Sequence, residues 1–73
     1  MLLQDDAIEI CLSAAINEYE TNNIELLNAE FDPSTNQWYV TFRVWEWLKV
    51  IWKAWEGDAG KIYYAVHKDF QVT

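Results

Sequence analysis

Residue types that could perform covalent chemistry are scarce in this 73-residue chain. His67 is the only histidine and Cys11 the only cysteine, which excludes an internal disulfide and any paired-cysteine zinc or redox motif. A nucleophile and base pair would need the fold to bring Ser13, Ser34 or Cys11 to His67, since none lies near it in sequence. Alternation places His67 on the solvent face of a strand, and helical spacing places Cys11 on a buried face. The sequence therefore predicts a protein that is not an enzyme.

Two compact groups of acidic residues are the only candidates for holding a metal ion. Asp5, Asp6 and Glu9 form one group, and Glu56 and Asp58 form the other. Neither matches the twelve-residue ligand pattern of an EF-hand. A helix start, whose dipole favours acids, explains the first group more simply, and a solvated turn explains the second. We expect neither metal nor cofactor, and two glycines in the whole chain make a glycine-rich phosphate loop improbable.

Residues suited to recognition are concentrated in one eleven-residue run that holds four of the five tryptophans. Tryptophan is enriched in cores and in binding patches, so the run either fills the interior or contacts a partner. Lys49 and Lys53 lie between the indoles, a pattern that could stack bases beside phosphates. The net charge of −7 opposes nucleic-acid binding and favours a protein contact or a core role. The four tryptophans are Trp45, Trp47, Trp52 and Trp55.

Charge is divided unevenly along the chain. Residues 1–36 hold eight acidic residues and no Lys or Arg, whereas residues 37–73 hold five basic and four acidic residues. Such an acidic half repels nucleic acid and anionic lipid, and it either keeps the protein soluble or binds a basic partner. No secretory signal is visible in this chain, and no stretch approaches the length of a membrane span. The cellular compartment stays open.

The spacing of apolar residues indicates the elements that position these side chains. An amphipathic helix is predicted over residues 7–19, where apolar residues recur every three or four positions. Asp5 or Asp6 is expected to cap its start, with Glu9 as partner in a capping box, and Asn22 or Asn23 to end it. The apolar stripe consists of Ile8, Cys11, Leu12, Ala15, Ile16 and Tyr19.

Strands are predicted downstream by alternating apolar and polar residues, at 27–31, 38–45 and 61–68. Turn-forming residues from Asp32 to Asn36 join the first two as a hairpin. Residues 45–56 are ambiguous, since polar residues spaced by three or four indicate a helix. Abundant β-branched and aromatic residues, with alternation from Val50, favour a strand at 49–56. That interpretation requires a turn near Trp45 to Lys49 without Gly, Pro, Asn or Asp.

The segment Trp52 to Ile62 resembles the end of PepSY-type domains, where a strand runs into an acidic residue, a short turn and Gly-Lys-Val or Gly-Lys-Ile. Here Glu56 stands where Asp is usual and Ala59 where Thr is usual. The resemblance implies a helix packed on an antiparallel sheet, in a small binding or peptidase-modulating module without catalytic residues. Cystatin-like and NTF2-like immunity proteins are similar in their order of elements and are also binding proteins.

These features predict one α+β domain over residues 1–73, with an N-terminal amphipathic helix packed on a three- or four-stranded antiparallel sheet. The uncovered sheet face is expected to bind a protein such as a peptidase or toxin, or a second copy in a homodimer. The expected function is that of a non-enzymatic inhibitor or modulator. The alternative is an acidic nucleic-acid mimic that binds a basic nucleic-acid-processing enzyme. The expected contact residues are Trp45, Trp47, Trp55, Tyr39, Arg43 and Tyr63.

Overall fold

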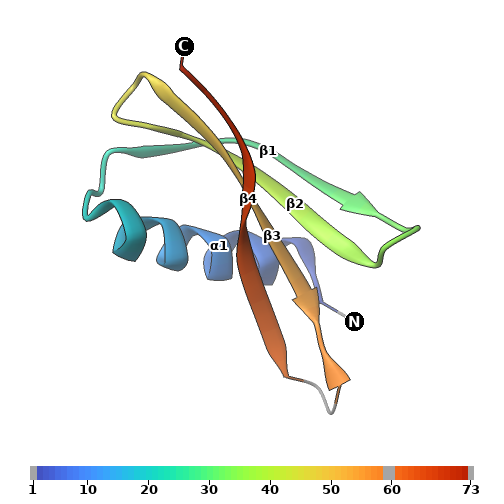
Figure 1. Cartoon of the computed structure of the whole chain (residues 1–73). Helices are drawn as coiled ribbons and strands as arrows, with labels where there is room; N and C mark the ends of the chain where they lie inside the picture. The colour runs from blue at the N-terminus through green and yellow to red at the C-terminus, as the bar shows by residue number, and fades with distance from the viewer. Residues whose placement is uncertain (1, 59–60, 73) are drawn as a thin grey trace.

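One helix lies across one face of a four-stranded antiparallel sheet (Figure 1). The computed structural model describes residues 2–58 and 61–72, and for residues 62–72 it describes the backbone alone. The strands pair in sequence order. The predicted α+β fold is confirmed, with four strands in the sheet. The elements are α1 (Gln4–Tyr19), β1 (Ile24–Asp32), β2 (Gln37–Val44), β3 (Leu48–Glu56) and β4 (Ile62–Val72).

The core lies between α1 and the sheet face that α1 covers. The helix buries small residues against this face, which lets its backbone approach the sheet closely. The larger Ile8 and Leu12 of the predicted stripe therefore lie half buried beside the core. Trp52 is 4% exposed and is the one tryptophan of the run that is buried in this core. Among the side chains that the structure describes, the buried residues are Leu2, then Ala7, Cys11, Ala14 and Ala15 from the helix, and Val40, Phe42, Val44, Val50, Trp52 and Ala54 from the sheet.

The helix ends at Tyr19, as predicted, but the residues predicted to cap its two ends are wrong. The N-cap position holds Leu3, which makes no side-chain cap hydrogen bond, so Asp5 and Asp6 lie within the first turn. The start of the helix is held by packing instead of a side-chain cap, because Leu2 is buried in the core. The acids remain favourably placed near the positive end of the helix dipole. The left-handed residue after the helix is Glu20, at φ 52°, rather than either predicted asparagine.

The predicted polar hairpin between β1 and β2 is confirmed. The Asp32 carboxylate accepts hydrogen bonds from the backbone N–H of Ser34 at 3.0 Å and from its hydroxyl at 2.7 Å. Asn36 has φ 58°, a left-handed conformation that asparagine tolerates. β1 starts earlier than predicted, and its pairing with β2 is irregular between Leu26 and Asn28. That bulge interrupts the alternation on which the prediction of a shorter strand depended.

The ambiguous residues 45–56 form a turn followed by a strand, and not a helix. Residues 48–56 form β3, which pairs with β2 on one side and β4 on the other. A central strand satisfies its backbone hydrogen bonds at both edges while alternate side chains enter the core. The predicted last strand is longer than expected, because β4 runs from residue 62 to 72.

Candidate protein-contact surface

The turn between β2 and β3 has a backbone conformation that its residues disfavour. Trp45 and Glu46 have φ of 53° and 68°, and the N–H of Trp47 donates to the carbonyl oxygen of Val44 at 3.3 Å. Two successive residues at positive φ are typical of a type I′ turn, for which Asn-Gly is the preferred pair. Each non-glycine residue in this region costs about 1–2 kcal/mol. The predicted turn without turn-forming residues is therefore confirmed, and it is strained.

Packing against the end of the helix holds this turn in place. The backbone N–H of Trp45 donates to the carbonyl oxygen of Asn23 at 2.9 Å. The Trp45 ring meets Tyr19, the last residue of α1, edge to face, with 5.8 Å between ring centroids. Tyr19 in turn meets the buried Trp52 at 6.4 Å. Burial and then the Glu18 carboxylate raise the pKa of the Tyr19 hydroxyl, so this ring stays neutral within the cluster.

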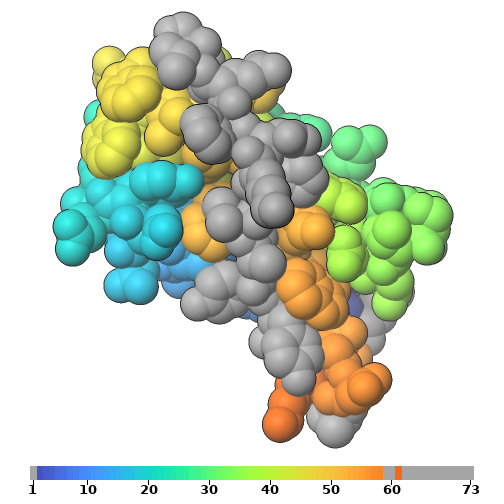
Figure 2. All heavy atoms as spheres, viewed as in Figure 1, coloured from blue at the N-terminus to red at the C-terminus, as the bar shows by residue number. Residues whose placement is uncertain are grey.

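Trp47 is the exposed member of this cluster. Its side chain is 47% exposed, and its indole stacks on that of Trp45 with 5.7 Å between centroids and 23° between planes. Figure 2 shows the side chains of this part of the chain (yellow) at one corner of the molecule, above the segment that ends the helix (cyan). We refer to Trp45, Glu46 and Trp47 as the tryptophan turn. It presents one half-exposed indole supported by a half-buried one.

The sheet face opposite α1 carries basic, polar and aromatic side chains from β2 and β3. In the strand register Tyr39 lies opposite Lys53, and Arg43 lies opposite Lys49. The Arg43 guanidinium pairs with the Glu25 carboxylate of β1 at 3.4 Å, and the Tyr39 hydroxyl donates to Gln37 Oε1 at the same distance. We refer to this surface as the open face. Its members are the half-buried residues Tyr39, Thr41, Arg43, Lys49, Ile51, Lys53 and Trp55.

The structure divides the predicted contact residues between these two surfaces. Tyr39, Arg43 and Trp55 lie on the open face, as alternation predicted. Trp45 and Trp47 belong to the tryptophan turn, where Trp45 packs against the helix side of the sheet. Two left-handed residues reverse the chain at this point, so alternation no longer predicts which side a side chain occupies. The expected continuous surface is therefore two surfaces.

Two further predicted residues lie on β4. Tyr63 is opposite Trp55 in the strand register. The side chains of Tyr63 and His67 lie outside the described residues, so the predictions for their roles stay predictions.

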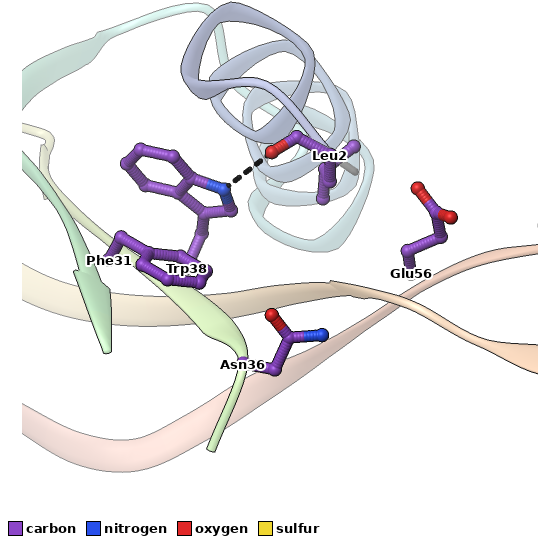
Figure 3. Close-up of a pocket in the computed structure, with 5 residues that line it drawn as sticks. All are labelled: Leu2, Phe31, Asn36, Trp38 and Glu56. Carbon is purple, nitrogen blue, oxygen red and sulfur yellow. Dashed lines mark hydrogen bonds between the residues drawn. The ribbon is translucent and has the colours of Figure 1, made fainter. Parts of the chain in front are cut away.

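A pocket at the other end of β2 was not predicted. It has a volume of about 300 Å³, and its lining includes Trp38 and Phe31, whose ring centroids are 5.3 Å apart (Figure 3). Trp38 Nε1 donates to the carbonyl oxygen of Leu2 at 2.9 Å, joining residues 36 apart in sequence. The indole N–H is the only hydrogen-bond donor of the Trp38 side chain, and this bond uses it. Trp38 therefore helps to fix the start of the chain. The pocket is lined by Leu2, Phe31, Asn36, Trp38 and Glu56.

The described part of the chain buries its cysteine and holds no group of side chains spaced as metal ligands. Burial raises the pKa of the Cys11 thiol to about 12, so it is protonated at neutral pH and is a poor nucleophile. Among residues 2–58 and 61, no three His, Cys, Asp or Glu side chains are grouped as metal ligands would be. Within the same described residues, no helix combines the length and the apolar character needed to cross a bilayer.

Comparison of this chain with known protein families, curated proteins and solved structures finds no match. The resemblance to PepSY-type domains therefore stays a prediction.

Proposed function

We propose that this protein is a non-enzymatic protein-binding module, with the tryptophan turn as its main contact site. One observation carries the proposal: Trp45 and Glu46 hold a strained turn that keeps the Trp47 indole half exposed. The two left-handed residues together cost about 2–4 kcal/mol. Backbone strain of this kind clusters at functional sites, where the surrounding structure maintains it. An Asn-Gly pair at positions 45 and 46 would avoid the strain, but it would remove the Trp45 ring on which the Trp47 indole stacks.

The exposed part of Trp47 is large enough to dominate a binding interface. At 47% exposure, a side chain of about 250 Å² leaves roughly 120 Å² in water. Burying that area in a partner contributes about 3 kcal/mol, which is the scale of an interface hot spot. Stacking on Trp45 already restricts the indole, so binding loses less side-chain entropy.

The partner that fits this site is a protein with an apolar pocket for one indole. A peptidase or toxin that the module inhibits or modulates meets this description, and so does a second copy of the chain. A membrane is a poor alternative, because the chain has a net charge of −7 and anionic lipid would repel it.

Substitution of Trp47 with serine tests the proposal. Trp47→Ser removes only the exposed indole. Trp45→Ser is unsuitable, because it would remove a ring that packs against the core. Leu26→Ser is the matched control, because Leu26 is 46% exposed and belongs to β1 rather than to the turn. Circular dichroism should show that both variants remain folded.

Two binding measurements then decide the result. Sedimentation equilibrium compares the masses of the wild type and the two variants, and affinity capture from the source extract compares the proteins they retain. We expect Trp47→Ser alone to lose the dimer or the captured protein. Identical masses and identical captured proteins for all three would refute the role of the tryptophan turn.

The acidic nucleic-acid mimic is kept as a second candidate because of the helix surface. Every acidic residue of α1 is exposed, and the helix contains no Lys or Arg. A basic enzyme bound there should dissociate steeply as salt is raised and should still be captured by Trp47→Ser. Capture that is indifferent to salt would remove this candidate. The exposed acids of the helix are Asp5, Asp6, Glu9 and Glu18, followed by the exposed Glu20.

A further inference from the structure

The two sides of the molecule differ in charge. The charged side chains of α1 are all carboxylates, whereas the open face carries three of the five Lys and Arg residues of the chain, namely Arg43, Lys49 and Lys53. Figure 1 shows the helix across one face of the sheet. The three cations alternate along β2 and β3 with the residues buried on that face, so they lie on the opposite face. A helix is about 10–12 Å across with its side chains, and charge is screened within about 8 Å at physiological salt. A ligand on the open face therefore meets the cations before it meets the acidic helix.

The cations of the open face form two rows with a neutral row between them. Lys53 lies opposite Tyr39 in one row, and Lys49 lies opposite Arg43 in the other. Four residues separate the two lysines along β3, which is about 14 Å at about 3.4 Å per residue. An extended polypeptide has the same rise, so its side chains at positions i and i+4 share one side and reach both rows. The neutral row consists of Thr41 and Ile51.

We propose that the open face binds an extended acidic peptide segment with two carboxylates four residues apart. One carboxylate lies at Lys53, and the other lies between Arg43 and Lys49, whose like charges stand directly opposite each other. The existing pair of Arg43 with Glu25 at 3.4 Å shows that a carboxylate reaches this row. A small apolar side chain at position i+2 covers the neutral row. Trp55, two residues beyond Lys53 on the same face, adds aromatic contact at one end.

Single-stranded nucleic acid is the other anionic ligand that an aromatic and basic sheet face could take. The local charge balance favours the peptide. Glu25 and Glu30 are exposed along the β1 edge of this face. Among the side chains that the structure describes, the face therefore carries three cations and two carboxylates. A polyphosphate places a charge at every nucleotide and accumulates repulsion from these acids and from a chain of net charge −7. A peptide places its two charges only at the two cationic rows.

Fluorescence anisotropy with labelled synthetic peptides tests this proposal independently of the tryptophan turn, which is a different surface. The first probe is a ten-residue peptide with two glutamates four positions apart and alanines or threonines elsewhere. The second has the same composition, with one glutamate moved by one position so that it leaves the binding side. The third is a ten-nucleotide oligothymidylate. Titrations at low salt, about 20 mM, preserve exposed ion pairs.

We expect the first peptide to bind the wild-type protein several-fold more tightly than the second. Lys49→Gln and Lys53→Gln should each weaken it by about three-fold, the scale of an exposed ion pair. Lys61→Gln is the matched control, since Lys61 is exposed in the β3–β4 connection and lies outside the open face. Absence of peptide binding, equal binding of both peptides, an equal effect of Lys61→Gln, or tighter binding of the oligothymidylate would each overturn the proposal.

Discussion

Replacing Glu46 with glycine should stabilise the fold by relieving half of the strain in the tryptophan turn. Glu46 has φ 68°, where a side chain costs about 1–2 kcal/mol. Glycine avoids that cost. It also makes the unfolded chain more flexible, which lowers the free energy of unfolding by about 0.4–1 kcal/mol. The relief of backbone strain in Glu46→Gly should therefore raise the free energy of unfolding by about 1 kcal/mol. For a domain of this size, that corresponds to a Tm increase of about 4–8 °C.

Two other left-handed positions provide controls for this reasoning. Asn36 has φ 58°, and asparagine already tolerates this region, so Asn36→Gly should change stability by less than about 0.5 kcal/mol. Glu20 has φ 52° at the end of α1, where glycine is the usual residue, so Glu20→Gly should stabilise about as much as Glu46→Gly. Thermal and urea unfolding followed by circular dichroism measure all three. A loss of stability in Glu46→Gly, or equal effects at Glu46 and Asn36, would refute the assignment of strain.

Three further predictions follow from individual side chains. Cys11 should react with iodoacetamide at pH 8 only after the protein is unfolded, because burial raises its pKa to about 12; rapid alkylation of the native protein would contradict its burial. Hydrogen bonds from Ser34 hold the pKa of Asp32 below its usual value. Their contribution to the free energy of unfolding is therefore present above about pH 4 and is lost as pH falls through the folded-state pKa. Asp32→Asn should accordingly make the stability profile flatter in acid, and an unchanged acid slope in urea unfolding would count against this. Trp38→Phe should lower the free energy of unfolding by about 1 kcal/mol, because the 2.9 Å bond to the Leu2 carbonyl oxygen is lost; urea unfolding that matches the wild type would show that the bond contributes nothing.

The open-face assignments were predictable from local pattern, because successive side chains of a strand point to opposite sides. That rule placed Val40 and Phe42 in the core and Tyr39 and Arg43 on the other side, as the structure shows. The same rule failed at Trp45, where positive φ breaks the strand geometry.

The ambiguity of residues 45–56 had a geometric cause. Lys49 and Lys53 are four residues apart, and that spacing puts two side chains on one face of a helix and equally on one face of a strand. Pairing with β2 and β4 on both sides decided the matter, and it buried Val50, Trp52 and Ala54. No local feature of the run encodes those neighbours.

By itself, the sequence determined the order of the elements, the α+β class and the absence of paired cysteines, because periodicity and composition are local properties. Only the tertiary structure decided what each tryptophan does. Trp45 packs on Tyr19 at the end of the helix, Trp38 bonds to Leu2, and Trp47 stays half exposed. An indole is large enough to be buried on one side and exposed on the other, so segments far away in sequence decide its environment.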